Sequence, residues 1–234
     1  MNRVEQKRYG YEIVLWLMLG IGAVGWGEPA FSLPKPSRKA EASLQISIRM
    51  HNYAEGHRDT VEHAEREVAR IFREVGIEIS WVSCPLTEAE LGLYSACLEP
   101  AHSLIFDMNV VPRFMAMRAS MPETSLGFTS LTKEGRASVA TVFYDSVKDM
   151  AEPTAPALTA ILAYAMAHEL GHLLLPNSGH SSGGIMRARW TPEDLRNAVY
   201  GKLFFTSGQG KSMRAEVRAR AQKRATLADA TASK

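Results

Sequence analysis

Residues 157–175 read ALTAILAYAMAHELGHLLL, a stretch in which Glu169 is the only charged residue. A helix that is apolar on all sides is buried in a protein core or in a membrane. Pro176 follows directly, and because proline lacks an amide hydrogen and disfavours helical geometry in the residue before it, the helix should end at Leu175. The sequence therefore predicts a long buried helix that carries a few polar groups near its C-terminal end.

Those polar groups are His168, Glu169 and His172, which form the pattern His-Glu-x-x-His. Histidines four residues apart lie on the same face of a helix, so both imidazoles can bind one metal ion. Zinc held by neutral nitrogen ligands with one open position activates a water molecule, and a neighbouring carboxylate can take its proton. We therefore expect a Zn²⁺ site with Glu169 as the general base. The alternative is a set of ordinary core side chains, but burying them without a metal would be costly.

A catalytic zinc ion usually takes three protein ligands, so a third ligand should follow along the chain. His180 is the nearest candidate, because residues 176–179, Pro-Asn-Ser-Gly, favour a turn that brings the chain back. The rivals are Glu193 and Asp194. However, the run Thr-Pro-Glu-Asp at 191–194 is equally explained as the capped start of a helix. We expect His180 to be the third ligand.

This part of the chain resembles the metzincin clan of zinc peptidases. The clan's motif is a long helix with two histidines and a glutamate, then a third histidine, then a tight turn whose methionine lies under the metal. The residues that match in kind and order are His168, Glu169, His172, His180 and Met186. The connection to the third histidine is two residues longer than in the strict motif, and it lacks the motif's glycine. The runs HELGHLLL and GIMRA are also similar to those of a group of uncharacterised bacterial metallopeptidases.

The resemblance implies a single zincin-like domain, a peptide or protein substrate, and Met186 as the residue of the Met-turn. A lone buried methionine is otherwise usually core filler. Tyr200 is a candidate donor for the oxyanion of the reaction, although a packing role explains it as well.

The N-terminus has the pattern of an export signal. Lys7 and Arg8 precede an apolar stretch at residues 13–24, and small residues follow. The apolar part is shorter than the roughly 20 residues that cross a bilayer, which favours a cleaved signal peptide at 1–27 over a retained membrane anchor. Residues 28–43, with three prolines, would form a linker. We expect the folded domain to be secreted or periplasmic, with a membrane as partner only if the segment is retained.

The chain has two cysteines, Cys84 and Cys97. In an oxidising compartment an even count favours pairing, and the spacing of these two matches no zinc site. We expect one disulfide bond between them. In the loop-closure model it would contribute about 3 kcal/mol to stability.

The rest of the pattern predicts a small sheet packed on helices. Apolar residues at helical spacing, ended by Gly76, predict a helix at 59–75, and alternating or β-branched runs predict strands. The expected strands are 44–50, 77–82, 103–111, 126–131 and 138–145. The expected fold class is therefore α+β. By the metzincin resemblance strand 126–131 would line the substrate cleft, whereas its sequence alone fits an ordinary edge strand.

The folded domain is expected to span residues 44–205, a length that suits one core and a monomer. Residues 206–234 are basic and rich in alanine, and predict a solvated helix that frays into a disordered tail. The net charge of the chain is only +2, so we expect no nucleic-acid partner.

Together these features predict an exported zinc-dependent peptidase, most simply an endopeptidase. Two other functions stay open at this point: a zinc-binding envelope protein of the same fold without turnover, and a zinc hydrolase of a non-peptide amide. A purely structural zinc site needs no base, so Glu169 argues against the first.

Overall fold

The structure is a computed structural model that describes residues 43–54, 58–99, 103–118, 125–131, 137–151, 155–175 and 179–232. The predicted signal peptide at 1–27 lies outside the described residues. All elements below belong to one compact unit, Ala40–Lys234.

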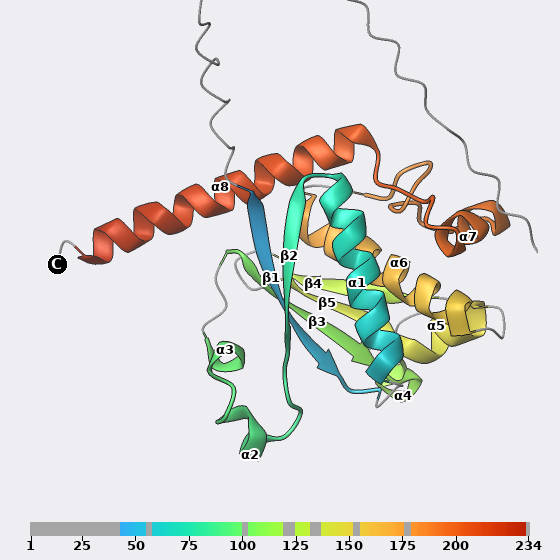
Figure 1. Ribbon diagram of the computed structural model, residues 1–234, viewed down its shortest axis with the longest axis horizontal. Coiled ribbons are helices and arrows are strands. Elements are labelled where there is room, and N and C mark those ends of the chain that lie inside the picture. Colours follow the sequence, from blue (N-terminus) through green and yellow to red (C-terminus); the bar gives the residue numbers. More distant parts are fainter. Residues whose placement is uncertain are drawn as a thin grey trace, which may run out of the picture. The chain divides into compact units, whose positions relative to one another are not determined.

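The described part of the chain forms one mixed sheet in the order β2-β1-β3-β5-β4 (Figure 1). Its strands are β1 (Leu44–Asn52), β2 (Ile77–Ser83), β3 (Ile105–Val111), β4 (Gly127–Leu131) and β5 (Ala137–Phe143). Neighbouring strands are parallel except at one edge, where β4 pairs antiparallel with β5. These strands are the ones expected from the sequence, with bounds that differ by one or two residues.

Helices lie between most of the strands, and the last four elements of the chain are helices. They are α1 (Arg58–Glu74), α2 (Glu88–Leu91), α3 (Ser95–Leu98), α4 (Arg113–Arg118), α5 (Tyr144–Met150), α6 (Ala155–Leu174), α7 (Pro192–Val199) and α8 (Ser207–Ala232). The mixed sheet and the long helix α6 confirm the expected α+β class.

The main core lies between one face of the sheet and the helices α1 and α6. On β1 the alternate residues Ile46, Ile48 and Met50 are buried in this core. Helix α6 is long and apolar enough to cross a membrane by length and composition, but 78% of its apolar window is buried inside the protein. Its all-round apolar surface is therefore that of a core helix.

Strand β5 is shorter than expected, because the chain becomes helical at Tyr144. Tyr144 and Val147, three residues apart, are buried on one side of α5. Asp145 lies in the first turn of α5, where a negative charge stabilises the positive end of the helix dipole. Its carboxylate also accepts a hydrogen bond from the main-chain N–H of Arg113 at 2.7 Å.

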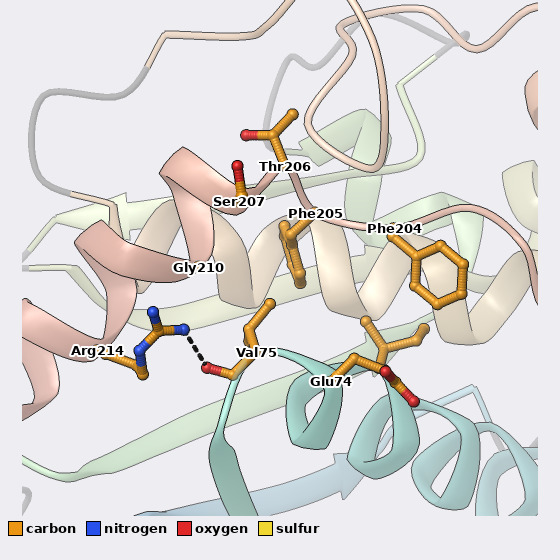
Figure 2. Close-up of a pocket in the computed structure, with 9 residues that line it drawn as sticks. Glu74, Val75, Phe204, Phe205, Thr206, Ser207, Gly210 and Arg214 are labelled. Carbon is orange, nitrogen blue, oxygen red and sulfur yellow. Dashed lines mark hydrogen bonds between the residues drawn. The ribbon is translucent and has the colours of Figure 1, made fainter.

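The C-terminal helix α8 also differs from the expectation, because its first half packs on the core instead of being solvated. Met213 and Val217, four residues apart, are buried with the residues of α1 and α6. Arg214 donates to the carbonyl of Val75 at 2.8 Å, beside a pocket of about 380 Å³ between the end of α1 and the start of α8 (Figure 2). Arg220 donates to the carbonyl of Leu173 at the end of α6. The domain therefore extends past residue 205.

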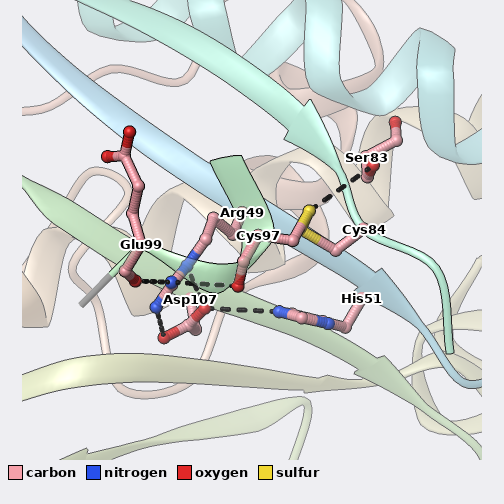
Figure 3. The surroundings of a disulfide bond; sticks show 7 residues. All are labelled: Arg49, His51, Ser83, Cys84, Cys97, Glu99 and Asp107. Atoms are coloured by element: carbon pink, nitrogen blue, oxygen red, sulfur yellow. Dashed lines mark hydrogen bonds and ion pairs between the residues drawn. A yellow bond between two sulfur atoms is a disulfide. The ribbon is translucent and has the colours of Figure 1, made fainter. Parts of the chain in front are cut away.

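Cys84 and Cys97 form a disulfide bond, with 5.8 Å between their Cα atoms. The bond holds the segment with α2 and α3 beside Arg49 of β1, whose guanidinium donates to the carbonyl of Glu99 and to both carboxylate oxygens of Asp107 (Figure 3). Burial alone would raise the pKa of Asp107. Hydrogen bonds from His51 and Arg49 outweigh it and hold this pKa below its usual value.

Candidate metal centre

His168 and His172 lie one turn apart on α6, with their Nε2 atoms 3.1 Å apart. Zinc binds imidazole nitrogens at about 2.0–2.1 Å in a tetrahedron, a geometry that separates two ligand nitrogens by about 3.3 Å. The two rings are therefore already spaced as a pair of zinc ligands. The spacing follows from the four-residue separation in the helix.

The orientation of His168 is fixed from outside the helix. Its Nδ1 lies 2.7 Å from the main-chain carbonyl oxygen of Ile185. Because a carbonyl oxygen only accepts, Nδ1 carries the proton, which leaves the lone pair of Nε2 free for a metal. The same carbonyl accepts a bond from the indole Nε1 of Trp190 at 3.1 Å, and the indole lies edge-on to the His168 ring.

His180 completes the group. Its ring centroid lies 5.3 Å from that of His168 and 5.0 Å from that of His172. One ligand atom from each of the three lies within 4.8 Å of the others, and among the described residues no other such group of three occurs. The structure thus brings together the three histidines that the sequence selected.

The two acidic residues considered as the third ligand, Asp194 and Glu193, lie at the start of helix α7. Asp194 forms a capping box with Thr191 at the start of α7, and its carboxylate is 2.8 Å from the guanidinium of Arg187. Glu193, next to it, is exposed. Both residues therefore lie in the first turn of a capped helix, as the run at 191–194 predicted.

Met186 lies in a closed turn under α6. The turn is held by a bond from the N–H of Ser181 to the carbonyl of Met186, and Gly184 has a φ of 73° that a side chain would strain. Met186 is fully buried, and a Cβ built on Gly171 of α6 would lie only 2.5 Å from its Sδ atom. The methionine thus packs on the helix turn between His168 and His172.

Glu169 is buried, with 6% of its surface exposed. Burial raises the pKa of its carboxyl to about 7, and a hydrogen bond from Thr129 opposes part of this effect. A carboxyl with a pKa near neutral can both take and return a proton at physiological pH. Burial also lowers the pKa of His168 to about 4, assisted by the neighbouring His172 and His180, so this ring is neutral as a metal ligand requires.

Three contacts of this centre were not predicted from the sequence: the carbonyl of Ile185, the indole of Trp190 and the hydroxyl of Thr129. The first two depend on how the turn folds back, which no local pattern encodes. The contact of Thr129 could have been inferred from the sequence, because Thr129 is a polar residue on the buried side of strand β4. Tyr200, considered as an oxyanion donor, is 71% exposed at the end of α7.

The chain is similar to solved structures at low identity. No protein-family model matches the chain, and no curated protein matches its sequence. A zinc-dependent peptidase from Methanocorpusculum labreanum is 15% identical, with a TM-score of 0.46 over 71% of this chain and 99% of that one. An archaemetzincin from Methanopyrus kandleri is 10% identical, with a TM-score of 0.47 over 76% of this chain and 99% of that one.

Three imidazoles that can reach one ion, one with its tautomer set by a carbonyl, are a donor set that zinc prefers. Three protein ligands leave one tetrahedral position open, as in catalytic zinc sites. The cluster offers one ion three imidazole ligands, and the buried carboxyl of Glu169 is next to them in the chain.

Proposed function

We propose that this chain is an exported zinc-dependent peptidase of the metzincin type, with His168, His172 and His180 as the zinc ligands. The observation that carries the proposal is the three-histidine cluster with the buried Glu169 beside it. A structural site would close with a fourth protein ligand and would have no use for a buried carboxyl of raised pKa.

Zinc bound in this cluster would lower the pKa of a bound water and polarise the carbonyl of the substrate. Glu169 takes the proton of the water as general base and returns it to the leaving amine. His168 is held as the neutral Nδ1–H tautomer by the carbonyl of Ile185, so this ligand needs no proton rearrangement to bind the ion.

The edge strand β4 favours an endopeptidase. Among the described strands β4 pairs only with β5, so its other edge is free to pair with an extended peptide. The same strand contacts Glu169 through Thr129. A chain bound along β4 would continue past the catalytic centre in both directions, which is what cleavage within a chain requires.

Export is supported by the disulfide bond and by the N-terminal pattern. Disulfides persist in oxidising compartments, and Cys84 and Cys97 are paired. N-terminal sequencing of protein recovered outside the cytoplasm tests this part, with a start near Glu28 expected. An intact Met1 in a membrane fraction would replace the signal peptide by an anchor.

The activity is tested by incubating the purified zinc form with a peptide library and reading the products by mass spectrometry. Internal cleavage sites are expected. The control is Glu169→Gln, which should keep zinc and fold but lose activity by about 10²- to 10⁴-fold, the usual share of general acid–base catalysis. Equal hydrolysis by this variant would refute the assigned mechanism, and absence of cleavage by the wild type would refute the peptidase.

A further inference from the structure

The hydroxyl of Thr129 touches the candidate base at two points. Its Oγ1 lies 3.0 Å from the carboxylate Oε2 of Glu169 and 3.0 Å from the main-chain oxygen of the same residue. The two residues are 40 positions apart in the sequence, so the contact joins the edge strand β4 to helix α6. We propose that Thr129 is a positioning residue that fixes the carboxyl of Glu169 for proton transfer. This inference rests on the function proposed above.

A hydroxyl suits this task because it has one proton and two lone pairs. With Glu169 ionised, Oγ1 donates its proton to Oε2 in a charge-assisted bond. Once Glu169 has taken a proton from water on Oε1, Oε2 still accepts the hydrogen bond from Oγ1. The carboxyl therefore keeps a partner before and after the transfer, and Thr129 gains and loses no proton.

Gly127 confines the other side of the carboxyl. It lies on the same face of β4 as Thr129, two residues away. A Cβ built on Gly127 would lie 3.0 Å from Cγ and 3.1 Å from Oε1 of Glu169, and 2.3 Å from the carbonyl oxygen of Thr141. The backbone of β4 thus approaches the Glu169 carboxyl at a position where only glycine fits. The Thr129 hydroxyl holds the same carboxyl at Oε2.

The sheet register determines which residue of β4 meets the helix. Thr129 is paired with Ala140 and Gly127 with Val142, and both β5 partners are fully buried on the core side. A slip of one residue would turn Phe128 towards Glu169 and Thr129 away from it. The position of the base therefore depends on an edge strand that substrate can pair with.

The test compares Thr129→Val, which keeps the shape and removes the hydroxyl, with Thr129→Ser, which keeps the hydroxyl. The valine variant should lose about 10- to 100-fold in kcat, the effect of a misplaced catalytic group, with KM and zinc content unchanged. The serine variant should recover most of the rate. Thr141→Val, on the opposite face of the sheet, is the matched control and should behave as wild type. If the valine variant does not fold, Thr129→Ala takes its place.

A second readout is independent of turnover. In crystal structures of the zinc-loaded proteins, the Glu169 carboxyl should occupy one rotamer in the wild type and in Thr129→Ser, and a different or split rotamer in Thr129→Val. An unchanged rotamer, or a valine variant with wild-type kcat, would overturn the positioning role. A wild type that cleaves no peptide would refute the proposed function alone, since the rotamer still tests the contact.

Discussion

Gly171, between Leu170 and His172 in the zinc-binding turn of α6, gives the sharpest test of the packing under the metal centre. A Cβ added there would lie 2.5 Å from Sδ of Met186 and 3.1 Å from Cε1 of Phe205. Optimal contacts between non-bonded heavy atoms are about 3.5–4.0 Å, so the sulfur must retreat by about 1 Å. Met186 is fully buried, so it can retreat only within the core.

The two opposing effects of Gly171→Ala can be compared. Alanine is favoured over glycine inside a helix by about 1 kcal/mol. Overpacking a buried side chain costs about 1–3 kcal/mol. We therefore expect a net loss of stability of about 0–2 kcal/mol. Zinc binding should weaken as well, because the residue before Met186 supplies the carbonyl that orients His168.

A double-mutant cycle with Met186→Ala isolates the contact. In that background the two contacts with Met186 are removed and only the 3.1 Å approach to Phe205 remains, so Gly171→Ala should stabilise the protein by up to about 1 kcal/mol through helix propensity. Urea unfolding of the four metal-free proteins should therefore give a coupling energy of about 1–3 kcal/mol, within the range found for residues in contact. If Gly171→Ala changes the stability of the wild type and of the Met186→Ala protein by the same amount, the coupling energy is zero and the contact is refuted.

Three further predictions concern other parts of the molecule. His180→Ala should weaken zinc binding by at least about 100-fold in a competition titration, more than is usual for an outer contact; unchanged affinity would return the third-ligand role to an acidic residue. Burial raises the pKa of Glu65 in α1 from 4.5 to about 7, so its contribution to stability is present below 4.5 and is lost as the pH rises through 7. Glu65→Gln should therefore gain about 1–2 kcal/mol over the wild type at pH 8 and little at pH 4.5, measured by urea unfolding; a gain equal at both pH values would contradict this. Replacing Cys84 and Cys97 by serine should cost about 3 kcal/mol in the same assay, and an unchanged midpoint would show that the bond adds no stability.

The elements that the sequence predicted are those whose pattern is local. The apolar run that ends before Pro176 predicted α6, and the alternation Leu44, Ile46, Ile48, Met50 predicted β1. In both cases the spacing of the apolar residues shows which faces of the element are buried. The docking of α8 was missed because the first half of the helix holds only two large apolar residues, Met213 and Val217, among many basic and small ones. Two residues are too few to distinguish a docked helix from a solvated one.

The grouping of the three histidines was predictable for the same reason, since two of them occupy one helix face and the third follows the helix closely. The groups that orient them were not, because each comes from another segment. The carbonyl of Ile185 has no sequence signature at all, as every residue carries one. Thr129 is different: an inward-facing polar residue on a strand next to a catalytic helix must find a partner in the core, because a buried hydroxyl without one is costly. The nearest unsatisfied group on such a helix is the carboxyl of its base. An inward polar position on the edge strand is therefore the place to look for the residue that positions the base when only a sequence is known.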